Sequence, residues 1–162
     1  MNPVINGVKI PNYLIGKLNE TVLNKAKDTD LRNALERDGY LFLRNAIEND
    51  AIARAREEIF QKLGEVDELQ YPFSEGIASG QSKRDTLYSD RGAFWEQISN
   101  LITLRQVTNG KALKGIFDKI FGTPTVGFDF IFLRAVAGGK FTHMPGDAGF
   151  FTRETEKILT CW

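Results

Sequence analysis

His143 and Asp147 are the residues whose types and spacing best suit metal chemistry in this chain. They lie four positions apart in "HMPGDAGFF", a Gly-rich segment between apolar runs. Non-haem iron oxygenases hold Fe(II) with two histidines and one carboxylate and leave coordination positions open for co-substrate and oxygen. A histidine and an aspartate at this spacing also occur in ordinary loops, where the imidazole hydrogen-bonds a nearby side chain. Spacing alone leaves both interpretations open.

The geometry of the segment limits how one ion could bind both residues. In a regular strand, four residues at about 3.3 Å each would separate the two side chains by roughly 13 Å, too far for one ion. A tight turn through Pro145-Gly146 would bring them together, and Pro-Gly is a strong turn former. A two-ligand site therefore requires a turn here.

Composition limits the classes of protein to which the chain can belong. Its 162 residues suit a single domain, and Lys+Arg equals Asp+Glu at 21 each, so no net field favours nucleic acid. No apolar run approaches the ~20 residues that cross a bilayer, and the start lacks the pattern of a secretory signal. The single cysteine, Cys161, lies in an apolar run and is expected to be a buried, unreactive thiol. We expect a cytoplasmic protein that binds neither nucleic acid nor membrane.

Helical periodicity dominates residues 28–122. The pattern predicts a helix capped by Thr29 or Asp30 and ended by Gly39, and a second capped by Asn49 or Asp50 and ended by Gly64. Further helices are expected over 93–107 and 111–121, the second of them ended by Gly122. The loop 67–92 between them is long enough to be functional, as a lid carrying Tyr71, Phe73, Arg84 and Tyr88, or to be an ordinary surface loop.

Strand patterns appear at 40–44, 126–136, 140–142 and 157–162. The second of these alternates three phenylalanines, expected in the core, with other residues. The predicted fold is α+β: an irregular arm (1–27), a mainly helical part (28–122) and first strands (123–162). The last strand pattern contains no turn residues, so we expect one incomplete domain whose sheet continues elsewhere.

Two segments resemble the phytanoyl-CoA dioxygenase family in their order and spacing. The first is "ERDGYLFLRNAIENDAIARAREEI", in which a helix ends in an acidic-Asp-Gly turn before a strand and another helix. The second is "FDFIFLRAVAGG" followed by "HMPGDAGFFTRETEKILTCW", similar to the iron-binding segment of that family. The resemblance covers most of the chain from about Asp28 onward.

The resemblance implies a double-stranded β-helix (jelly roll, cupin-like), Fe(II), 2-oxoglutarate as co-substrate and oxidation of a small-molecule substrate. Asp147 matches the carboxylate ligand, and Trp162 matches a tryptophan beside the 2-oxoglutarate site. Arg134 stands near the place where many relatives carry a lysine, so the resemblance implies that Arg134 helps to position the co-substrate carboxylates. His143 is the available second ligand.

Two departures from the family pattern bear on activity. The ligand histidine of the family falls at Pro145, which has no side-chain lone pair, and His143 comes two residues earlier. The second ligand histidine, with the arginine that pairs with 2-oxoglutarate, would lie beyond Trp162. We therefore expect an amino-terminal fragment of such a dioxygenase (an oxidoreductase), inactive by itself. The alternatives are a non-catalytic relative with a binding or structural role, or an unrelated small α+β domain.

Overall fold

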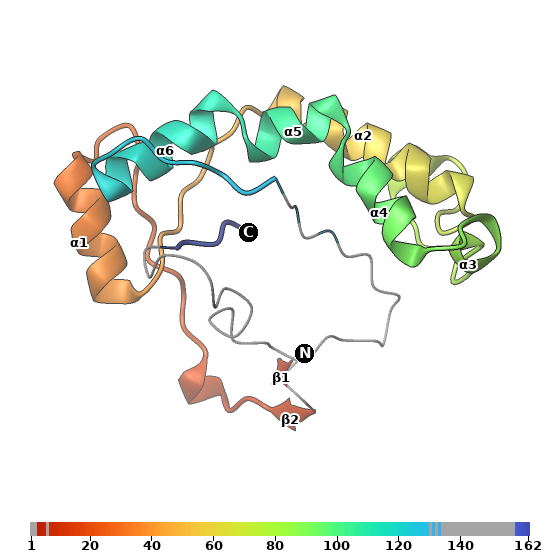
Figure 1. The fold of residues 1–162 in the computed structure, drawn as a ribbon. Helices are drawn as coiled ribbons and strands as arrows, with labels where there is room; N and C mark the ends of the chain where they lie inside the picture. The colour runs from red at the N-terminus through yellow and green to blue at the C-terminus, as the bar shows by residue number, and fades with distance from the viewer. Residues whose placement is uncertain (1–2, 6, 130, 132, 134–157) are drawn as a thin grey trace. The chain divides into compact units, whose positions relative to one another are not determined.

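The computed structural model describes residues 3–5, 7–129, 131, 133 and 158–162 (Figure 1). The chain separates into two compact units, residues 17–138 and residues 1–16 with 139–162. About half of the described chain is helical, 49% against 5% strand. The helices are α1 (Asp28–Asp38), α2 (Asn49–Glu65), α3 (Arg84–Leu87), α4 (Arg91–Ser99), α5 (Ile102–Thr108) and α6 (Lys111–Phe121), with short 3-10 turns η1 (Asn12–Leu14) and η2 (Phe73–Glu75).

In the smaller unit, the described residues of 1–16 form a hairpin followed by η1. Strands β1 (Val4–Ile5) and β2 (Val8–Lys9) pair antiparallel, with Val4 opposite Lys9. The apolar side chains around η1 are exposed, including Tyr13 and Leu14. The arm thus has regular structure but buries little apolar surface of its own.

Two glycines end helices as the sequence predicts. Gly39 follows α1 with φ 75° and Gly122 follows α6 with φ 68°, both in the left-handed conformation that glycine adopts without a steric penalty. The predicted bounds of 111–121 are confirmed. At its start, α1 differs from the prediction: Lys27 is the first residue outside the helix, and Asp30 accepts a hydrogen bond from the Lys27 N–H at 2.8 Å.

Helix α2 also differs in detail from its prediction. It is preceded by Glu48, not capped by Asn49 or Asp50, and Gly64 lies inside it and is buried. Of its apolar residues at helical spacing, Ala55 and Leu63 are buried while Ile52 is exposed. Gly64 is needed because a Cβ there would meet the Phe73 ring at 2.4 Å. Its role is therefore close packing within the helix, and not helix termination.

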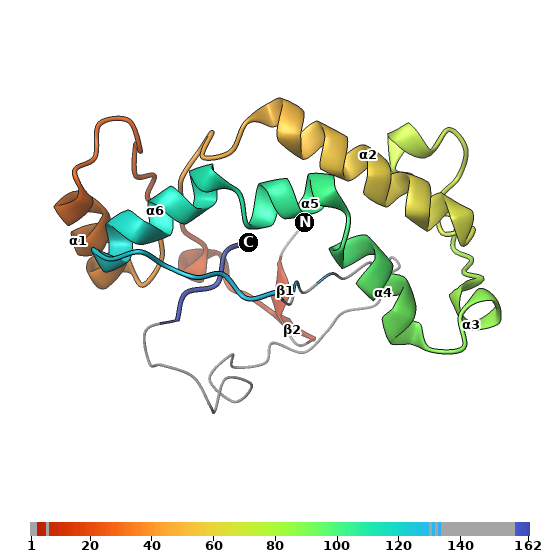
Figure 2. The ribbon, with the colours of Figure 1, turned by 45° about the horizontal axis from the view of Figure 1, so that its top comes forward.

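The helix expected over 93–107 is two helices, α4 and α5, separated at Asn100-Leu101 (Figure 2). Leu104 is buried against Ile98 and its neighbours. Six residues after Ile98, it would lie roughly 240° around an unbroken helix and point away from that core. The break redirects α5, and Arg105 Nε donates to the Ser99 carbonyl at 2.6 Å, satisfying an acceptor that the break leaves unpaired.

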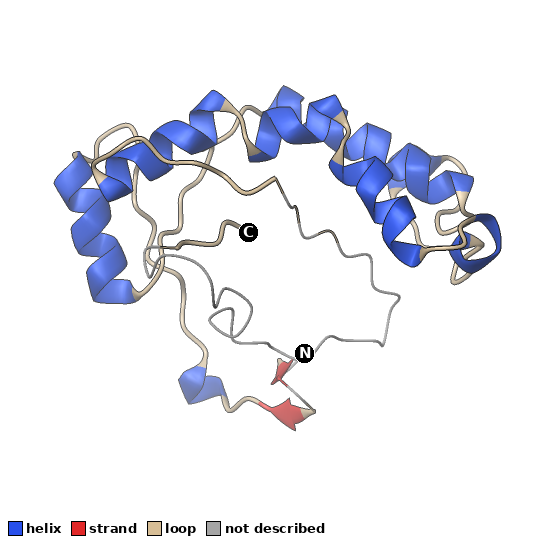
Figure 3. Ribbon diagram, in the orientation of Figure 1, coloured by secondary structure: helices blue, strands red, loops and turns tan. Residues whose placement is uncertain are grey.

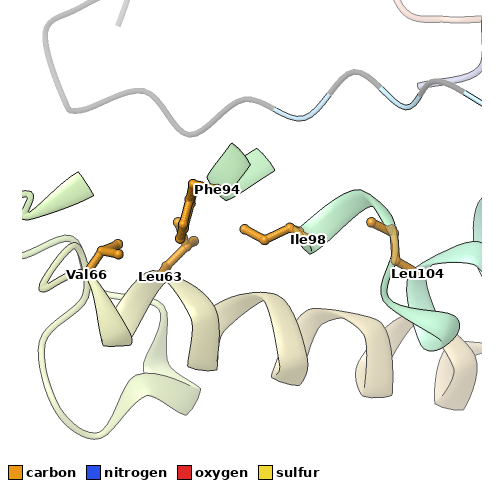
Figure 4. Close-up of a cluster of buried hydrophobic side chains, with 5 residues drawn as sticks. All are labelled: Leu63, Val66, Phe94, Ile98 and Leu104. Atoms are coloured by element: carbon orange, nitrogen blue, oxygen red, sulfur yellow. The ribbon is translucent and has the colours of Figure 1, made fainter. Parts of the chain in front are cut away.

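The main core lies where α2, α4 and α5 meet (Figure 4). We call this the Phe94 cluster; it consists of Leu63, Val66, Phe94, Ile98 and Leu104. Phe94 is fully buried and packs edge-on against the rings of Tyr88 and Trp95, with centroids 5.3 and 5.1 Å away. A smaller core lies between α1 and α6, which lie side by side in Figures 1 and 2.

The predicted jelly roll is wrong for the part of 123–162 that the structure describes. Strand is limited to β1 and β2 among the described residues (Figure 3), and residues 126–129 and 158–162 have no regular structure. Ile131 and Leu133 instead pack against the Phe94 cluster, and Asn109 Nδ2 donates to the Phe128 carbonyl at 3.4 Å. In the sequence 128–133, apolar residues occur at both even and odd positions. An apolar side chain is therefore available for packing on a helix whether or not the segment pairs with another strand.

Other strand predictions fare similarly. The segment 40–44 makes a single parallel bridge, Phe42 to Glu20, and is not a strand. Phe128, expected in the core, is 46% exposed. Phe130, Phe132 and the expected strand 140–142 lie outside the described residues.

Candidate functional site

The residues predicted to bind iron and co-substrate fall mostly in the part of the chain without described coordinates. His143, Asp147, Pro145 and Arg134 lie outside the described residues. Trp162 is described, and its side chain is fully exposed. Between the described residues, no group of three or more His, Cys, Asp or Glu side chains is arranged to hold a metal ion.

The fit between this chain and an iron site rests on its donor chemistry. An imidazole and a carboxylate are ligand types that suit Fe(II). Their number does not, because one histidine among 162 residues cannot supply the two of a two-histidine, one-carboxylate site. The residues present are thus of the ligand types that suit the metal, but there is one histidine too few.

Cys161 differs from its prediction in one respect. The residue is exposed, whereas the sequence predicted a buried thiol. Partial desolvation raises the pKa of the thiol above its ordinary value. A raised pKa lowers the fraction of reactive thiolate at neutral pH.

The best-defined polar cluster lies in the loop that the sequence marked as a lid or a surface loop. Arg84 Nε donates to Glu68 Oε1, and Ser82 Oγ donates to the same oxygen at 2.6 Å. The Arg84 guanidinium also lies 4.6 Å from the Trp95 ring centroid and 5.3 Å from that of Phe94. Side-chain exposure is 21% for Arg84 and 12% for Glu68, so this ion pair is largely shielded from water.

This arrangement fixes the loop on the helices. The guanidinium of Arg84 contacts a carboxylate on one side and aromatic rings on the other. Its ion-pairing and its cation–π interactions are therefore both made within the chain. Backbone bonds add to the attachment: Lys83 N donates to the Val66 carbonyl at 2.8 Å and Ser79 N to the Glu68 carbonyl at 2.9 Å. The cluster therefore has a structural role in joining the loop to α4.

The other end of the loop is held by two reciprocal contacts between an aromatic ring and a glycine. The Phe73 ring lies over Gly64 of α2, and the Phe60 ring of α2 lies over Gly76 of the loop. Tyr71, beside Phe73, is 87% exposed and is a residue of this loop still available for contact with another molecule. Sequence reasoning named Tyr71, Phe73, Arg84 and Tyr88 but missed Glu68 and Trp95, since nothing in a single sequence pairs Arg84 with residues 16 and 11 positions away.

Two cavities among the described residues of the unit 17–138 lie near the segment 20–26. One of about 320 Å³ is bordered by α1 residues, and the other, of about 410 Å³, lies between this segment, Arg44 and Lys119. Arg44 is already paired with Glu20 at 3.2 Å and stacks 4.7 Å above the Phe42 ring. Neither cavity contains a residue predicted to bind iron or co-substrate.

Comparison with protein-family models, with curated proteins and with solved structures found no match for this chain. In the described residues, no helix combines the length and the apolar character that crossing a bilayer requires.

Proposed function

We propose that this chain is related to the Fe(II)/2-oxoglutarate-dependent oxygenases of the phytanoyl-CoA dioxygenase type, with Asp147 as an iron ligand and His143 as the second. The observation that carries the proposal is the order of two sequence segments, Glu36–Ile59 and Phe128–Trp162, which together resemble that family. Such a site, when complete, uses 2-oxoglutarate and oxygen to oxidise unactivated carbon atoms of a small molecule.

Local structure in the first segment supports the proposal. Helix α1 ends at Gly39, the chain then passes through an extended bridge at Phe42, and α2 begins at Asn49. This matches the helix, turn and second helix on which the resemblance was based, with a single bridge in place of the expected strand. The proposal concerns the ligand segment and not a barrel, because the described residues of 126–133 form no strand.

The role of the chain's own residues is limited to binding. Asp147 would contribute the charged oxygen ligand, Trp162 would cover the co-substrate and Arg134 would pair with one of its carboxylates. With a single histidine the ligand set is incomplete, so we assign no catalytic step to these 162 residues.

Anaerobic calorimetric titration with Fe(II) tests the proposed ligands. Asp147→Ala and His143→Ala should each weaken binding by more than about tenfold, since even outer-shell partners of metal ligands contribute 10–100-fold. The exposed Asp129 provides the matched control, and Asp129→Ala should bind like the parent. Absence of saturable binding by the parent, or equal binding by Asp147→Ala, would refute the assignment.

A second candidate function follows from Pro145. In a non-catalytic relative, the protein would function without a histidine ligand at this position, and the chain would act as a binding or structural protein. Pro145→His separates the two functions. If Asp147 is correctly placed in the family pattern, this change supplies the absent imidazole and should raise Fe(II) affinity above that of the parent. An unchanged titration would favour the non-catalytic function.

We also expect no turnover of 2-oxoglutarate by the chain alone, because the ligand set is incomplete. The measurement is iron-dependent formation of succinate by the purified 162-residue protein, with a known 2-oxoglutarate oxygenase as the positive control. Succinate above the level of an iron-free sample would contradict the one-histidine argument.

A further inference from the structure

We draw no further inference here: the strongest candidate, the open cavity of about 410 Å³ between the segment 20–24, Arg44 and the last turn of α6, carries nothing because Glu20 already pairs with its arginine and the negative end of α6 disfavours any anion that its lysine would attract.

Discussion

Two parts of the unit 17–138 each enclose a fully buried side chain, yet they differ in how they are built. The Phe94 cluster joins three helices and the long segment 67–92, whereas α1, which carries the fully buried Leu31, packs directly on α6. Both helices of the pair end at a left-handed glycine. The comparison teaches that local signals suffice for helices that pack on one another, while a core completed by a loop depends on contacts that are distant in sequence.

The largest expected effect is removal of the ring at the centre of the Phe94 cluster. Phe94→Ala should lower the free energy of unfolding by about 3–5 kcal/mol, because a fully buried phenylalanine leaves a large cavity. Leu31→Ala, the matching change between α1 and α6, should cost about 2–5 kcal/mol and less than Phe94→Ala, since fewer atoms are removed. Urea unfolding followed by circular dichroism measures both values.

Ile102→Ala is the control for these two changes, because Ile102 is 74% exposed. It should change stability by no more than about 0.5 kcal/mol. A larger loss for Leu31→Ala than for Phe94→Ala would reverse the ranking of the two cores.

A smaller effect on stability is expected from alanine substitution of two helical glycines, one in α2 and one in α6. Gly64→Ala should destabilise by about 1–3 kcal/mol, because its methyl group would displace the Phe73 ring that holds the loop on α2. Gly115→Ala, in α6, has no atom within 4 Å of the new methyl group and should stabilise by about 0.5–1 kcal/mol through helix propensity.

Hydrogen exchange would locate the Gly64 effect. Faster exchange of the amides of Glu68, Gln70 and Ser79, which bond within or across the loop, is the expected result. If Gly64→Ala instead exchanged like the parent and were equally stable, the ring-to-glycine contact would not hold the loop.

The smallest expected effect is a change in stability at low pH, and it arises from Asp118 of α6. Hydrogen bonds from Lys114 and Thr125 lower the pKa of Asp118 to about 2 from an ordinary value of 3.8. The folded state therefore favours the ionised carboxylate, so this stabilisation is complete above about pH 4 and is lost as the pH falls towards 2. In Asp118→Asn, the melting temperature should decrease less than in the parent as the pH is lowered over that range.

NMR titration of the Asp118 carboxyl provides the direct measurement. Thr125→Val removes one donor and should move its pKa part of the way back towards 3.8. A midpoint unchanged by Thr125→Val would show that the contacts with Lys114 and with the backbone N–H of Thr125 account for the shift.

The sequence predicted the α1–α6 part better than the Phe94 cluster, and particular residues show why. Gly39 and Gly122 act within one turn of the helices that they end, so their effect is visible in the local pattern. Gly64 carries the same type of signal but serves to admit the Phe73 ring, nine residues later in the chain. Likewise the break at Asn100-Leu101 depends on where Leu104 must point, which periodicity does not reveal.

The proposed site was predicted only as far as residue types allow. An imidazole and a carboxylate in one Gly-rich segment are ligand types that Fe(II) accepts, and the single histidine limits how many ligands the chain can offer. The expected barrel was wrong because an alternating apolar pattern shows that a segment can be buried. It does not show whether a neighbouring strand or a helix buries it. In this protein, helices of the unit 17–138 lie against Ile131 and Leu133.

By itself, the sequence determined the helix-rich character of 28–122, the glycine stops after α1 and α6, the neutral overall charge and the shortage of histidine. All of these follow from local conformational preference or from counting. Tertiary structure alone decided the attachment of the loop through Arg84 and Phe73, the division of α4 from α5 and the packing of Ile131 and Leu133 on helices. Each of these depends on the burial of side chains far apart along the chain, because the free energy gained depends on which surfaces meet.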